Sequence, residues 1–183
     1  TPAQRASIDG HAALGAQRLR ECGVADELWV DAVARHHSTH PGPLAGLPGV
    51  AQLARLIQRT DIFAARLSRR RTRHALSGMA AAKATYLDEK GQPDEAGAAI
   101  IKATGIYPPG SFVRLASGEV AVVLRRGRLA NEPVVASVIS GAGMPLGEPV
   151  RRDTRIARHG VAAGVAPQDV RLRLNLERLL SLA

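Results

Sequence analysis

The chain has 183 residues, 45% of them hydrophobic, enough for one domain or for a larger lobe with a small appendage. No apolar run reaches the roughly 20 residues that a membrane-spanning helix needs, and the single cysteine has no partner for an internal disulfide, so we expect a cytoplasmic protein without a membrane span. The net charge of +9 favours anionic partners, but aromatic residues, at 3%, are too few for base-stacking surfaces, which argues against specific nucleic-acid binding.

The first 104 residues have the apolar spacing of helices. Hydrophobic residues recur three and four positions apart from Ile8 to Cys22, and Gly23 predicts the end of that helix. Asp26 predicts the cap of a second helix, which runs into His36 and His37. A loop rich in proline and glycine follows at 41–49, and helical spacing returns in 50–67, 77–86 and 96–103.

The pattern changes at Gly105. Residues 111–115 and 119–124 are rich in β-forming residues and are separated by Ser117-Gly118, which predicts a hairpin. Further expected elements are a strand at 133–139, a strand opening near Val150 and a helix within 167–182. We therefore expect a mainly α fold, with a helical lobe in residues 1–104 and a small antiparallel β module with a C-terminal helix in 105–183.

Four side chains of the helical lobe are candidate metal ligands: His11, His36, His37 and Asp61. They fall on three expected helices, which can bring such groups to one site when they pack side by side. Adjacent histidines on a helix point about 100° apart, so neighbouring ions could take one each. Imidazoles and carboxylates suit Fe, Mn or similar divalent ions, which can activate water for attack on phosphorus.

These residues stand in recognisable short motifs. The chain reads His-Ala-Ala-Leu-Gly-Ala from His11, Ala-Arg-His-His up to His37 and Arg-Thr-Asp up to Asp61. In this order the motifs resemble the HD-GYP branch of the HD phosphohydrolases, which hydrolyse cyclic di-GMP. Residues 105–123 resemble the tail that often follows such domains, so that the resemblance covers about residues 8–140. It implies an HD-type helical bundle in which the four residues hold divalent ions, Fe or Mn.

The resemblance extends to a basic segment after Asp61. The family has Ser-x-Arg-Pro-Tyr-Arg there, and residues 68–73 read Ser-Arg-Arg-Arg-Thr-Arg, which places Arg70 and Arg73 where the family contacts substrate phosphate. The implied function is a cyclic di-GMP phosphodiesterase-like signalling protein that binds a cyclic dinucleotide or another phosphodiester. The alternative for these arginines is a solvated helix end, since cations are favourable near a helix C-terminus.

Three departures from the family bear on activity. The family's His-Asp pair lies well upstream of the position of His11, where this chain has only ten residues. The His-His-Glu motif reads His36-His37-Ser38, and the loop at 39–47 is shorter than the family's. The chain is then either a fragment of a longer protein or a decayed domain, and we expect little or no hydrolysis from it. The second hypothesis is a catalytically degenerate HD-GYP-like module for signalling or partner binding.

Overall fold

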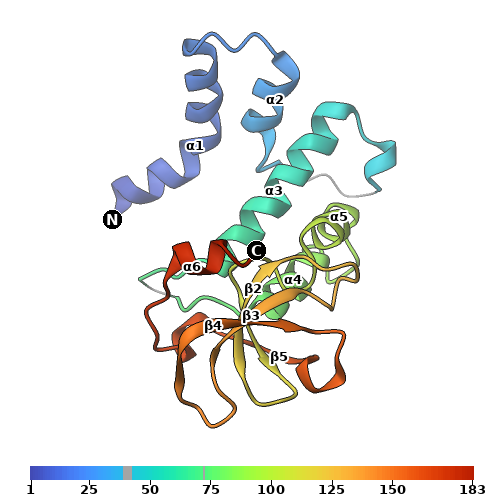
Figure 1. Cartoon of the computed structure of the whole chain (residues 1–183). Helices are drawn as coiled ribbons and strands as arrows, with labels where there is room; N and C mark the ends of the chain where they lie inside the picture. Colours follow the sequence, from blue (N-terminus) through green and yellow to red (C-terminus); the bar gives the residue numbers. More distant parts are fainter. Residues whose placement is uncertain (39–42, 72) are drawn as a thin grey trace.

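The computed structural model describes residues 1–38, 43–71 and 73–183. The expected mainly α fold, an HD-type helical bundle with a small appended β module, is wrong. The described residues are 46% helical and 19% strand, and the strands form one five-stranded antiparallel sheet. Helices α1 to α3 extend away from the sheet, whereas α4, α5 and α6 lie close to it (Figure 1). The sheet is larger than expected because an unpredicted segment with a weak strand signal, 161–165, joins it, and because the strand expected to open near Val150 spans 145–153.

Helices α1 (Pro2–Glu21) and α2 (Glu27–Arg35) pack on each other. Thr1 and Gln4 form a capping box at the start of α1, and the carboxylate of Asp26 accepts a hydrogen bond from the backbone N–H of Trp29 at the start of α2. Between them Gly23 has a φ of +83°, a conformation that glycine adopts without steric cost. The predicted end of the first helix and the predicted start of the second are therefore confirmed, whereas α2 ends at Arg35 and does not run into His36 and His37 as expected.

Helix α3 (Gly49–Leu67) contacts α2, α4 (Gly78–Tyr86) and α5 (Glu95–Thr104). Phe63 of α3 packs in one apolar cluster with Ala81 and Ala82 of α4 and with Ile100 of α5. None of the described helices has both the length and the apolar character that crossing a lipid bilayer requires. Because α4 also contacts β5, the helices and the sheet share an interface. The division into residues 1–104 and 105–183 stays a prediction.

Polar groups are buried where α3 faces α5. Arg55 and Arg59 of α3 are 5% and 2% exposed, and Asp94, which caps α5, is 8% exposed. Arg55 donates hydrogen bonds to Asp94, with Nε 3.0 Å from Oδ2, and also pairs with Glu89. Arg59 donates to the backbone carbonyls of Thr85 and Leu87. A buried ion-pair cluster therefore joins α3 to the start of α5 and to the end of α4.

Replacing Gly97 by alanine is expected to lower the free energy of unfolding by roughly 1–3 kcal/mol, because inserted atoms in a tight contact force backbone shifts. A Cβ atom at this position of α5 would lie 2.1 Å from the backbone oxygen of Thr85 on α4. Gly10 is the matched control, since a Cβ there in α1 has nothing within 4 Å. Its replacement by alanine should stabilise the helix by about 0.5–1 kcal/mol. Urea unfolding of both variants measures the difference, and equal effects would contradict the packing.

The sheet has the strand order β4-β3-β2-β1-β5, with every neighbouring pair antiparallel. Its strands are β1 (Phe112–Leu115), β2 (Val120–Arg125), β3 (Val134–Ile139), β4 (Pro145–Asp153) and β5 (Val161–Val165). The predicted hairpin is confirmed by the pairing of β1 with β2, and the predicted third strand by β3. β4 begins at Pro145, ahead of Val150, where its start was expected.

Both faces of the sheet carry apolar clusters. Alternate residues of β2 point to opposite faces: Val120 and Val122 belong to one cluster, Ala121 and Val123 to the other. The C-terminal helix α6 (Leu176–Leu180) covers the first face through Leu179. The helix expected over 167–182 is shorter because residues 170–174 alternate apolar and basic side chains, a period of two that suits extended chain and that places Leu172 and Leu174 against this cluster.

Candidate metal centre

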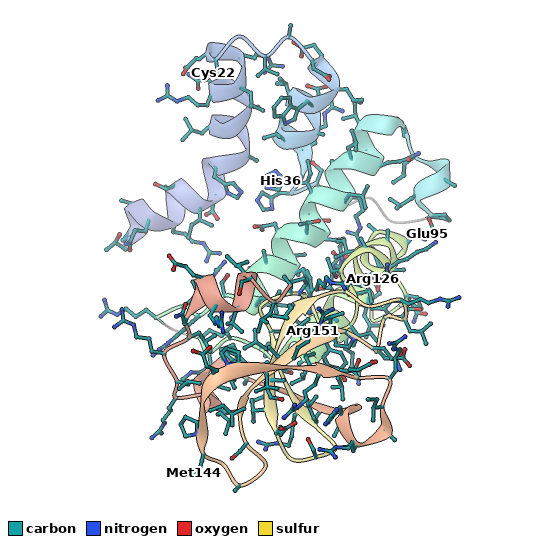
Figure 2. All side chains as sticks on the ribbon, viewed as in Figure 1. Cys22, His36, Glu95, Arg126, Met144 and Arg151 are labelled. Carbon is teal, nitrogen blue, oxygen red and sulfur yellow. The ribbon has the colours of Figure 1, made fainter. Side chains whose placement is uncertain are left out.

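Three of the predicted ligands meet where α2 ends beside α1. His11 lies in the middle of α1, His36 is the C-terminal cap residue of α2, and His37 follows it. His36 lies between α1 and α3 (Figure 2). The Nε2 atom of His11 is 3.1 Å from Nε2 of His36 and 3.2 Å from Nε2 of His37. One ring nitrogen from each histidine thus lies within 4.8 Å of the other two.

Backbone carbonyls fix the tautomers of two rings. Nδ1 of His11 lies 2.5 Å from the carbonyl oxygen of Ile8, and Nδ1 of His36 lies 2.6 Å from that of Val33. A carbonyl oxygen only accepts hydrogen bonds, so each Nδ1 carries a proton, and in the neutral ring each Nε2 then has the lone pair. Two lone pairs that face each other repel unless a proton or a cation lies between them. A carbonyl on the far ring nitrogen is also the usual way in which proteins orient a metal-binding histidine.

The spacing of the His11 Nε2 atom from the Nε2 atoms of His36 and His37 fits a single ion. Zn–N bonds of about 2.0–2.1 Å in tetrahedral geometry separate two donor atoms by about 3.4 Å. The separations of 3.1 and 3.2 Å need only a small outward movement of the rings to reach that value. Three imidazoles around an ion leave a fourth position, which is the arrangement of catalytic zinc sites.

Electrostatics favour the neutral form of His37. Desolvation, followed by repulsion from His36 and His11, lowers the pKa of His37 below its ordinary value of 6.5, although Asp61 and Asp9 act in the opposite direction. Since a histidine must be neutral to bind a metal, this ring is available near neutral pH. His36 is 5% exposed, whereas His11 and His37 are exposed, so the cluster opens to solvent on one side.

Asp61 lies outside the cluster of ring nitrogens. It is an exposed residue of α3, and the donor atoms within 4.8 Å of one another come from the three histidines alone among the described residues. Its carboxylate acts on His37 through its charge. The structure thus brings together three of the four predicted ligands, all of them imidazoles.

Arg70 and Arg73 line a separate hollow of about 480 Å³, together with Arg69, Arg71 and His74. The two residues exchange backbone hydrogen bonds of 3.0 and 3.3 Å. The guanidinium of Arg73 donates to the carbonyl of Ala65 near the end of α3, which is the helix-end role considered as the alternative. Thr72 of this motif, and residues 39–42 of the shortened loop, lie outside the described residues.

Comparisons of the chain with protein-family models, curated proteins and solved structures found no match. The chemistry of the donor set must therefore carry the interpretation. Neutral imidazoles suit Zn, Fe, Ni and Cu, whereas Mn prefers carboxylate and carbonyl oxygens. Within the expected pair of Fe and Mn, three imidazoles fit Fe better, and the identity of the ion stays a prediction.

Two features that bear on ligand binding were not predicted from the sequence. The carbonyls of Ile8 and Val33, each three residues before a histidine, orient the rings. Every helical residue follows a backbone carbonyl by three positions, so the sequence alone does not signal this contact. The second feature is a hollow at one end of the sheet, lined by arginines of three segments. No local motif signals it.

Proposed function

We propose that His11, His36 and His37 bind one divalent transition-metal ion through their Nε2 atoms. The convergence of three Nε2 atoms, two of them with tautomers fixed by backbone carbonyls, is the observation that carries this proposal. When bound, such an ion supplies Lewis-acid chemistry toward phosphoryl oxygens. The three imidazoles hold and orient it, and the exposed side of the cluster leaves room for a ligand.

We further propose that the chain is part of a cytoplasmic HD-GYP-type phosphohydrolase in signalling, whose ligand is cyclic di-GMP or a related phosphodiester. The order of the two histidine motifs and the aspartate motif that ends at Asp61 supports this assignment. The exposed guanidinium of Arg70 supports an anionic ligand, since guanidinium groups bind phosphate through paired hydrogen bonds.

A degenerate module that binds a ligand or a protein partner without hydrolysis is the second candidate. One observation favours it: among the described residues the cluster contains no carboxylate. Carboxylates bridge the ions of multinuclear hydrolytic sites, so these three imidazoles provide for one ion rather than two or three.

Hydrolysis and binding of cyclic di-GMP by Fe(II)-loaded protein separate the two candidates. The phosphohydrolase gives metal-dependent binding and slow release of the linear dinucleotide, and both should disappear in His36→Ala. Binding without any product would favour the degenerate module. Absence of both binding and product, with the ion bound, would contradict the phosphohydrolase.

The same assay tests the arginines. Replacing Arg70 and Arg73 by alanine should weaken cyclic di-GMP binding roughly 100-fold, since each charge-assisted hydrogen bond contributes on the order of 1.5–3 kcal/mol. Arg171 and Arg173, which are exposed on the segment before α6, are the matched control pair. Their replacement removes the same charge and should change affinity little at physiological salt. Equal losses from both pairs would mean that general charge attracts the ligand.

A further inference from the structure

A second basic hollow, of about 510 Å³, lies at the end of the sheet where β2, β3 and β4 meet. The arginines that line it are Arg125, Arg128, Arg151, Arg152 and Arg155. Among the residues that the structure describes, two carboxylates line it with them, Glu132 and Asp153. The hollow belongs to the sheet, whereas the histidine cluster belongs to α1 and α2, and Figure 2 labels Arg151 and His36 on these two parts.

Strand register brings these residues together. Arg125 of β2 pairs with Val134 of β3, which pairs with Asp153 of β4, so one row across three strands reaches the hollow. The register of β2 and β3 shifts between Val123 and Arg125, and such irregularities re-aim side chains at the ends of strands.

The connection between β2 and β3 is tightly folded at the rim. A Cβ atom on Gly127 would lie 1.7 Å from the backbone oxygen of Glu132, so only glycine fits there. The buried hydroxyl of Thr154 donates a 2.8 Å hydrogen bond to the carbonyl of Pro133 and ties β4 to the start of β3. These contacts hold the walls of the hollow in place without using its arginines.

Two of the five arginines are already engaged. Glu119 accepts hydrogen bonds of 2.7 and 3.0 Å from Arg152, and Asp153 accepts one of 2.7 Å from Arg155. Within residues 1–38, 43–71 and 73–183, Arg125, Arg128 and Arg151 make no ion pair and donate no side-chain hydrogen bond. Three guanidinium groups from separate segments thus surround one hollow with their donors free.

Protection of a sheet edge explains only part of this charge. β4 is an edge strand, and charged side chains on such strands discourage pairing with another chain. That reason applies to Arg151. It does not apply to Arg125, which is on an interior strand, or to Arg128, which is in the connection after it.

We infer that this hollow binds a small anion that carries two or more linked phosphate groups, as in a diphosphate or triphosphate. Its volume lies in the range of about 300–1,000 Å³ for small-molecule pockets. Three free guanidinium groups provide paired donors for phosphate oxygens. None of the described residues that line the hollow is aromatic, so the phosphates and not a base would be recognised.

Calorimetric titration with inorganic triphosphate at physiological salt tests the inference. Replacing Arg125 and Arg151 by alanine should weaken binding roughly 100-fold, as two charge-assisted contacts are lost. Replacing Arg125 and Arg151 by lysine keeps the charge but removes paired hydrogen bonding, and should weaken triphosphate binding about 10-fold. Both arginines are exposed, and if the alanine pair still fails to fold, the lysine pair carries the test.

A control pair completes the experiment. Replacing both Arg171 and Arg173 by alanine removes equal charge outside this hollow and should leave triphosphate affinity within about twofold. ATP should bind as tightly as inorganic triphosphate, because the hollow offers nothing to the base. The inference would be overturned if the control pair lost as much triphosphate affinity as the Arg125 and Arg151 pair, or if the unmodified chain showed no saturable binding. Duplex DNA binding that falls equally in every variant pair would also overturn it.

Discussion

Replacing His36 by alanine is expected to weaken divalent metal binding at least about 100-fold at neutral pH, because a buried donor and its orienting contact are both lost. The Nε2 atom of His36 is one of three that converge, and its Nδ1 is held by the carbonyl of Val33. Competition for Zn(II) or Fe(II) with a chromophoric chelator measures the change in affinity.

His74 provides the control for this experiment. It is an exposed histidine that lies outside the cluster, so its replacement by alanine removes an imidazole without removing a converging donor. The metal affinity of His74→Ala should stay within about twofold of the affinity of the unmodified chain. If His36→Ala and His74→Ala bind the ion equally well, the ion is held elsewhere.

Replacing Asp94 by alanine is expected to lower the free energy of unfolding by about 3–5 kcal/mol, the usual cost of removing one partner of a buried ion pair. Arg55 and Arg59, 5% and 2% exposed, would then lack their buried carboxylate. The helix cap, in which Asp94 accepts a 2.7 Å hydrogen bond from the backbone N–H of Gly97, would be lost as well. Urea unfolding measures the change.

Two further variants separate charge from other effects. Asp94→Asn keeps a capping oxygen and removes the charge, so it should restore only the capping part, about 1 kcal/mol. Asp9 forms an exposed pair with Arg5 at 3.5 Å, and its replacement by alanine should cost less than about 1 kcal/mol. Equal losses for Asp94→Ala and Asp9→Ala would show that the buried cluster does not stabilise the fold.

The sequence predicted those parts of the fold that depend on local patterns. Gly23 predicted the end of the first helix and Asp26 the start of the second, and the Ser117-Gly118 turn predicted the hairpin of β1 and β2. The sequence-based prediction of helices and strands was wrong where local patterns point to another structure. Leu172 and Leu174 were assigned to a helix because leucines at several spacings surround them, whereas their alternation with Arg171 and Arg173 describes extended chain. β5 was missed since its Ala-Ala-Gly core has little strand character.

Features that join distant residues could be predicted only in part. The separation of His11 from His36 suggested two packed helices, and the structure does place their Nε2 atoms 3.1 Å apart. Their role as metal ligands stays a prediction. Asp94 could be predicted as a helix cap, but its pairing with Arg55, 39 residues earlier, depends on how α3 packs against α5. Asp61 has the right place in the motif, yet it lies outside the nitrogen cluster.

Metal content of the unmodified chain tests the central claim most directly. The protein is loaded with Fe(II) or Zn(II), dialysed and analysed for metal per chain, with X-ray absorption spectroscopy to identify the ligands. We expect about one ion per chain, bound by three imidazole nitrogens at about 2.0–2.1 Å. A chain that retains no ion, or one that retains the same amount after His11, His36 and His37 are all replaced by alanine, would contradict it.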